Sequence, residues 1–110
     1  MASKASAAAL RVVFVTAPSN EVATELARSV VEGNLAACVN VIPGIKSIYS
    51  WEGKVHEDDE HLLVLKTTES AISALREKIL SLHPYDTPEF VSMPVTEASE
   101  KYAEWVRVQT

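Results

Sequence analysis

The stretch NLAACVNVIPGIKSIYSWEGKV, residues Asn34–Val55, predicts an unusually long β-strand followed by a tight turn. Apolar residues alternate along it with a period of two, as on a strand with one buried face. Pro43-Gly44 interrupts the alternation, which resumes in another phase, as at a β-bulge. Gly53 supplies the residue that a tight reversal needs, and the chain returns through an acidic run to the apolar residues 62–65. We therefore expect a long β-hairpin.

The segments on either side of the hairpin predict a βαββαβ order with one more helix at the end. Strands are predicted over residues 10–16 and 89–95, and the most regular helical pattern covers residues 72–82. This order is typical of the α+β, ferredoxin-like split βαβ fold, in which a four-stranded antiparallel sheet carries two helices on one face. We expect residues 10–110 to form a single domain after a disordered tail over residues 1–9.

Three helix starts are predicted from capping residues. Ser19, Thr68 and Thr96 each precede a segment of helical period and can cap it with a hydroxyl. In the last of these segments, Ala98, Tyr102, Trp105 and Val106 are expected to share one side of the helix.

The length of the hairpin predicts an assembly. At about 3.3 Å per residue, Ala36–Trp51 spans roughly 50 Å, whereas a compact chain of this length has a diameter of only ~34 Å. The other face of the sheet is left uncovered by the two helices, so the terminal helix or another subunit must cover it. Ile48, Tyr49 and Trp51 near the hairpin tip are good interface anchors. We expect an obligate homo-oligomer.

Composition excludes several classes of partner. The formal net charge is −5, which argues against a nucleic-acid partner, because a phosphate backbone calls for clustered Lys and Arg. The apolar runs are far shorter than the ~20 residues of a membrane-spanning helix. The chain has one cysteine, so no intramolecular disulfide forms and a reducing compartment, the cytoplasm, is the simplest location.

Three motifs together resemble the CutA family of divalent-cation-tolerance proteins: the Asn34–Val55 stretch, LLVLKT at residues 62–67, and HPYDTPEFVSMPV at residues 83–95. The resemblance implies a ferredoxin-like homotrimer with interlocked hairpins and a role in tolerance to divalent cations, with copper binding the usual assignment. It implies no established reaction. The trimer is also similar to the nitrogen-regulatory PII signalling proteins, a likeness of fold that assigns no ligand.

The resemblance points to Cys38 and His83 as ligands of copper, and a thiolate also accepts zinc. Tyr85, Asp86 and Glu89 follow His83 closely and offer further oxygen ligands, of which we select Glu89. A thiolate is the preferred soft ligand of Cu(I). The alternative interpretations are that Cys38 is a small buried hydrophobe and that His83 caps the preceding helix. Because one chain supplies few ligands, we expect subunit interfaces to complete the metal site.

A second candidate function is a PII-like sensing or scaffold module. In that interpretation Trp51, Lys66 and Tyr85 line an intersubunit cleft for a small anionic ligand or an unknown protein partner; the alternative for Lys66 is an extended side chain at a strand end. The acidic run at residues 56–61 is better explained as a solvated sheet edge than as a metal cluster.

An enzyme is not expected. Cys38 and His83 are residue types that nucleophilic catalysis uses, but no glycine-rich oxyanion turn, nucleophile elbow or phosphate loop accompanies them.

Overall fold

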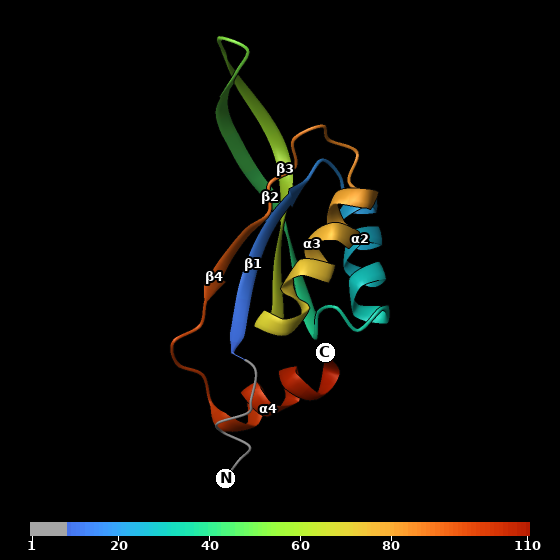
Figure 1. The fold of residues 1–110 in the computed structure, drawn as a ribbon. Helices are drawn as coiled ribbons and strands as arrows, with labels where there is room; N and C mark the ends of the chain where they lie inside the picture. The colour runs from blue at the N-terminus through green and yellow to red at the C-terminus, as the bar shows by residue number, and fades with distance from the viewer. Residues whose placement is uncertain (1–8) are drawn as a thin grey trace.

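The computed structural model describes residues 9–110 and contains a four-stranded antiparallel sheet with strand order β2-β3-β1-β4 (Figure 1). This confirms the ferredoxin-like α+β fold. The predicted disordered tail lies outside the described residues apart from Ala9, whose carbonyl accepts a hydrogen bond from the Glu69 N–H. The elements are β1 (Leu10–Ala17), α2 (Asn20–Glu32), β2 (Cys38–Trp51), β3 (Lys54–Thr68), a 3₁₀ turn (Glu69–Ala71), α3 (Ile72–Leu82), β4 (Val91–Pro94) and α4 (Glu100–Gln109).

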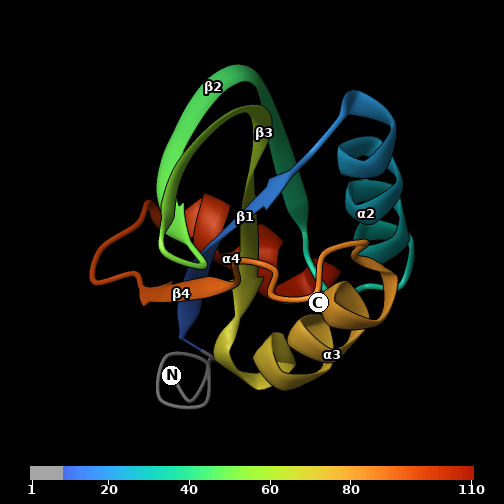
Figure 2. The same ribbon diagram turned by 90° about the horizontal axis from the view of Figure 1, so that it is seen from above.

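Helices α2 and α3 lie side by side on one face of the sheet (Figures 1 and 2). Alternate residues of β1 and β3 point to this face, where Val13 pairs with Leu65 and Val15 pairs with Leu63. Strand β4 is shorter than the predicted 89–95, and Phe90 packs against the core instead of pairing in the sheet. The core between sheet and helices consists of Val13, Val15, Ala17, Ala23, Leu26, Val30, Ala36, Leu63, Leu65, Leu75 and Ile79.

Two of the three predicted helix caps are wrong. The Thr68 hydroxyl makes no cap bond and instead shares hydrogen bonds with the hydroxyls of Ser70 and Thr110. Helix α4 begins at Glu100, well after Thr96. Its buried face also differs from the prediction.

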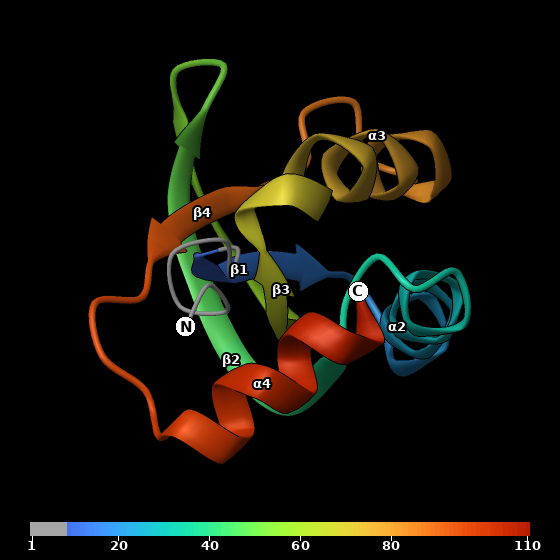
Figure 3. The same cartoon turned by 60° about the horizontal axis from the view of Figure 1, so that its bottom comes forward.

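The buried residues of α4 are Ala103 and Val106, while Tyr102 and Trp105 are exposed. The reason is the direction from which α4 meets the sheet. It packs across the end of the sheet around Leu10, so only the line through Ala103 and Val106 reaches the core (Figure 3).

The remaining cap is confirmed and is testable. The Ser19 hydroxyl accepts a hydrogen bond from the Val22 N–H, at 3.2 Å between the heavy atoms. Replacing Ser19 with alanine is expected to lower the free energy of unfolding by about 1 kcal/mol, measured by urea denaturation. Thr96→Ala is the matched control, expected to change it by less than about 0.5 kcal/mol because Thr96 caps no helix. Equal losses in the two variants would show that the Ser19 bond adds nothing.

The other face of the sheet, here called the open face, is only partly covered. Helix α4 covers its Leu10 end, where Leu10 packs with Ala103 and Val106 (Figure 3). Farther along, Val12, Phe14, Leu62, Val64 and Met93 share this face by register and are half-buried in the single chain. The terminal helix thus satisfies part of the predicted need for a cover and leaves most of the face without one among the described residues.

The long hairpin is confirmed and extends well beyond the rest of the chain (Figure 1), so that the molecule measures 53 × 25 × 22 Å. At its tip, Glu52 and Gly53 both have positive φ angles, 52° and 77°, as a two-residue hairpin turn requires. The predicted bulge is also present. Two residues, Pro43 and Gly44, lie opposite the single residue His61.

The bulge changes which residues face which side. Cys38 pairs with Lys66 before it, and Tyr49 pairs with His56 after it. Because the extra residue shifts the alternation by one, Cys38 and Tyr49 lie on the same face of the sheet despite their odd spacing. The hairpin therefore continues the open face.

Within residues 9–110, no helix combines the length and the apolar character needed to cross a membrane.

Candidate functional site

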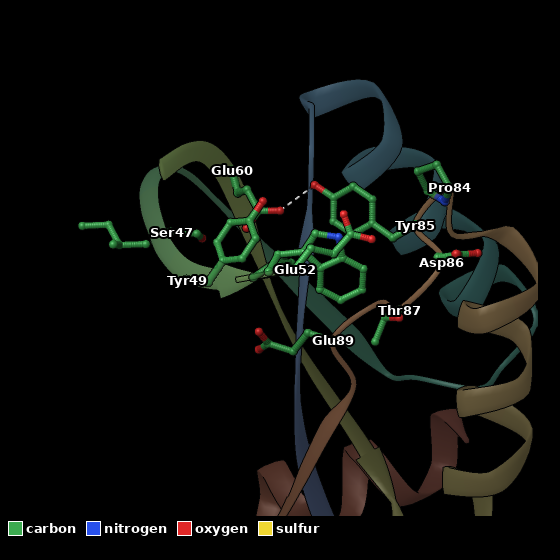
Figure 4. A pocket seen from close by; sticks show the side chains of 12 residues that line it. Ser47, Tyr49, Glu52, Glu60, Pro84, Tyr85, Asp86, Thr87 and Glu89 are labelled. Carbon is green, nitrogen blue, oxygen red and sulfur yellow. Dashed lines mark hydrogen bonds between the residues drawn. The ribbon is translucent and has the colours of Figure 1, made fainter. Parts of the chain in front are cut away.

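A groove of about 830 Å³ lies on the open face between the hairpin and the loop that joins α3 to β4 (Figure 4). Four carboxylates line it, and none of its lining residues is Lys, Arg or His. We call it the acidic groove, after Glu52, Glu60, Asp86 and Glu89. Its other lining residues are Thr16, Ser47, Ile48, Tyr49, Trp51, Pro84, Tyr85 and Thr87.

Glu60 is the most enclosed carboxylate of the groove, with 8% of the residue exposed. Its Oε2 accepts a hydrogen bond from the Tyr85 hydroxyl at 2.6 Å (Figure 4). Burial raises the pKa of Tyr85, and the hydrogen bond to Glu60 and the negative charge of Glu60 raise it further. Tyr85 thus keeps its proton and remains a donor to Glu60.

Glu89 projects into the same groove from the loop before β4 (Figure 4). Burial raises the pKa of Glu89, and repulsion from the Glu60 carboxylate adds to the effect. Two carboxylates of one groove therefore repel each other, and none of the lining residues is basic. This arrangement is unfavourable when the groove is empty and becomes favourable when a cation enters.

The negative charge continues along the hairpin. The Tyr49 hydroxyl donates a hydrogen bond to Asp58, which is the largest cause of the raised pKa of Tyr49. The Tyr49 ring stacks on His56 with ring centroids 5.5 Å apart. The predicted solvated acidic edge is thus present at residues 57–59, but the prediction is wrong for the buried Glu60.

His83 is held by both of its ring nitrogens and is 8% exposed. Its Nδ1 accepts a hydrogen bond from the Tyr85 backbone N–H at 3.2 Å, so its proton is on Nε2, which donates to the Thr16 carbonyl at 2.8 Å. The ring therefore joins β1 to the loop. It does not cap α3, whose end is closed instead by the His83 backbone N–H bonded to the Ile79 carbonyl.

Cys38 lies half-buried on the open face at the start of β2. The Lys66 ammonium lies opposite, 3.8 Å from the Cys38 sulfur, and also donates to the Asn40 side-chain oxygen. Tyr102 of α4 is close enough that the charge of Cys38, after the larger effect of burial, raises the pKa of Tyr102. The positive ammonium repels a metal cation that approaches the sulfur.

The structure separates the predicted ligands within one chain. Cys38 pairs with Lys66, whereas Thr16, the partner of the His83 ring, pairs with Leu62. Lys66 and Leu62 are four positions apart on β3, which corresponds to roughly 13 Å. One chain therefore does not bring Cys38 to His83.

The predicted cleft residues are divided in the same way. Trp51 and Tyr85 line the acidic groove together with Glu89, while Lys66 lies at the other end of the open face. Glu60 was not predicted as a site residue. Its place within the second strand of the hairpin was a signal, because a carboxylate in a strand can point to a partly buried face. Among the described residues, no three His, Cys, Asp or Glu side chains are close enough to hold a metal ion.

Comparison with known proteins gives consistent results. The family model of the CutA1 divalent ion tolerance protein matches residues 11–109. The divalent-cation tolerance protein CutA of Thermus thermophilus is 50% identical over 99 residues, which are 90% of this chain and 96% of that protein. The chloroplastic protein CutA of Arabidopsis thaliana is 48% identical over 90% of this chain, but the match spans only 54% of the plant protein.

Solved structures agree with the sequence relatives. The crystal structure of CutA1 from Oryza sativa superposes with a TM-score of 0.92 at 45% identity, covering 94% of this chain and 95% of that one. The chain spans about half the length of several curated relatives, among them the human protein CutA, of which it covers 54%. With the family model matched over nearly all of the described residues, the chain belongs to the CutA1 divalent ion tolerance family.

Proposed function

We propose that this chain serves divalent-cation tolerance by binding a divalent cation in the acidic groove, as a homotrimer, with copper as the first candidate and zinc as the second. The observation that carries the proposal is the pair of carboxylates, Glu60 and Glu89, which line one groove and repel each other, with no basic residue in the lining. A divalent cation between them removes their repulsion and gains two charged ligands.

The donor atoms favour copper as Cu(II). The groove offers carboxylate oxygens and the Tyr85 hydroxyl, and no sulfur. Among divalent first-row metals, a given site of oxygen and nitrogen ligands binds Cu²⁺ most tightly. Cu(I) prefers thiolate, and the only cysteine of the chain lies beside the Lys66 ammonium.

The incomplete ligand set supports an assembly. One described chain does not gather three acidic, His or Cys side chains around one point. The open face that carries the groove also keeps Phe14 and other apolar side chains half-exposed. A neighbouring subunit on this face covers those side chains and brings further ligands to the rim of the groove.

The alternative of a PII-like anion site has less support. The residues around Trp51 and Tyr85 are acidic, and Lys66 lies elsewhere in the chain. We also propose binding rather than catalysis, because Cys38 and His83, which a nucleophilic mechanism would pair, are apart within the chain. The cytoplasm remains the location that we propose, which subcellular fractionation tests.

The deciding experiment is a competition titration of the full chain with Cu(II), repeated with Zn(II) and anaerobically with Cu(I). Glu89→Gln is expected to weaken Cu(II) binding at least about tenfold, because it removes one of two charged ligands. Glu25→Gln, on the exposed side of α2, is the matched control, and Cys38→Ser is expected to bind as tightly as the unchanged protein. Binding lost in Cys38→Ser and kept in Glu89→Gln would overturn the groove as the site.

The pH dependence follows from Glu89. Because its pKa is raised above the ordinary value of 4.5, acidification neutralises it earlier than an exposed carboxylate. Cu(II) affinity is therefore expected to fall already above pH 4.5. For the metal-free protein the sign is opposite: the charged form of Glu89 costs stability, so its contribution to folding is favourable at low pH and is lost as pH rises through the raised pKa.

Glu89→Gln separates these two effects. Without metal, this variant is expected to be at least as stable as the unchanged protein at pH 7. Its Cu(II) affinity is expected to depend less on pH, because the glutamine does not titrate. Urea denaturation and Cu(II) competition at several pH values measure both. A metal-free variant that is clearly less stable at pH 7 would contradict the repulsion between Glu60 and Glu89.

A further inference from the structure

We propose that His83 is a positioning residue of the acidic groove and not one of its metal ligands. It holds the loop after α3 so that Tyr85 meets Glu60. The inference rests on the proposed cation site, and it assigns the histidine a role different from the one that its motif suggests.

Neither ring nitrogen of His83 is available to a metal ion. Nε2 donates to the Thr16 carbonyl of β1, and Nδ1 accepts from the Tyr85 backbone N–H. A metal ion on either nitrogen would have to displace one of these partners in a place that is almost closed to water. The partner left behind would be a polar backbone group without a hydrogen bond, which is costly.

The hydrogen bonds around His83 form a continuous chain from the sheet to the groove. β1 holds the His83 ring through Thr16, and the ring in turn holds the backbone of Tyr85. The two rings also touch, with centroids 4.7 Å apart. The Tyr85 hydroxyl then binds one oxygen of Glu60.

The consequence for the groove is orientation. With one Glu60 oxygen held by Tyr85, the carboxylate cannot rotate freely. Residues that orient ligands in this way typically change metal affinity by about 10–100-fold when they are replaced. His83 acts one step farther out, through Tyr85.

The test compares three variants of the full chain in Cu(II) competition titrations. His83→Ala and Tyr85→Phe are expected to weaken binding by about 10–100-fold, and the double variant by little more than either one, since both act through the same bond chain. His83→Gln is expected to restore most of the affinity, because its amide can donate to the Thr16 carbonyl and accept from the Tyr85 N–H.

A spectroscopic readout distinguishes a ligand from a positioning residue. A histidine ligand adds a nitrogen coupling to the electron paramagnetic resonance spectrum of bound Cu(II). We expect the spectra of the unchanged protein and of His83→Gln to show the same couplings, because His83 does not bind the metal. Such a coupling, lost together with the affinity in His83→Gln, would overturn the proposal.

The metal-free protein provides a readout that does not depend on the proposed function. Nitrogen NMR is expected to show the His83 ring protonated on Nε2, and His83→Ala is expected to shift the Tyr85 signals. If the unchanged protein binds no metal, the proposed function fails, yet these signals still decide whether His83 holds Tyr85. An Nδ1-protonated ring, or Tyr85 signals unmoved in His83→Ala, would overturn the inference.

Discussion

Replacing Ile48 and Val55 together with aspartate is expected to convert the proposed homotrimer into monomers. The two side chains lie on the same side of the hairpin, and 65% and 77% of them are exposed in the single chain. Apolar side chains so far from the core contribute to an interface more than to the fold. Buried in a subunit contact, an unpaired carboxylate costs several kcal/mol, which is about the scale that separates assembly from dissociation.

Sedimentation velocity at micromolar concentration measures this change, and far-UV circular dichroism checks that the variant remains folded. Leu80→Asp is the matched control, because Leu80 is exposed on the helical layer, away from the hairpin. It is expected to leave the assembly intact. An unchanged protein that sediments as a monomer, or a double variant that stays assembled, would refute the role of the hairpin tip.

Replacing Leu65 with alanine is expected to lower the free energy of unfolding by about 2–5 kcal/mol. Leu65 is completely buried, pairs with Val13 across the sheet and packs in the core beneath α2 and α3. Truncation removes apolar contacts and leaves a cavity between rigid layers that cannot close around it. Urea denaturation of the metal-free protein measures the loss.

Leu82→Ala is the comparison for this prediction. Leu82 continues the apolar stripe of α3, but it is 38% exposed at the end of the helix. Its truncation is expected to cost about 1 kcal/mol or less, because little apolar surface is lost from the core. Similar losses for Leu65→Ala and Leu82→Ala would contradict the assignment of the core.

The fold was predictable because its main signals are local. The alternation along β2, the interruption at Pro43-Gly44 and the turn at Gly53 all lie within one short stretch. Each is set by backbone preferences of nearby residues, so the hairpin could be deduced without knowing what it packs against. The Ser19 cap was predictable for the same reason.

The candidate site was less predictable because its contacts join distant parts of the chain. Glu60 is buried and accepts a hydrogen bond from Tyr85, which is 25 residues away. The His83 ring is hydrogen-bonded to the carbonyl of Thr16, 67 residues away. Cys38 lies next to Lys66 because the register of β2 and β3 pairs these two residues. Residue type alone indicated that these side chains could bind a metal, but only the register shows which of them meet.

The bulge at Pro43-Gly44 also sets the direction in which the hairpin leaves the sheet. Deleting Gly44 would leave one residue opposite His61 and restore regular pairing. Tyr49 would still pair with His56 and keep its side of the sheet, because its spacing from Cys38 would become even. The deletion would instead remove the local bend and the extra twist that a bulge adds, so the tip would carry the same side chains on each face and point another way.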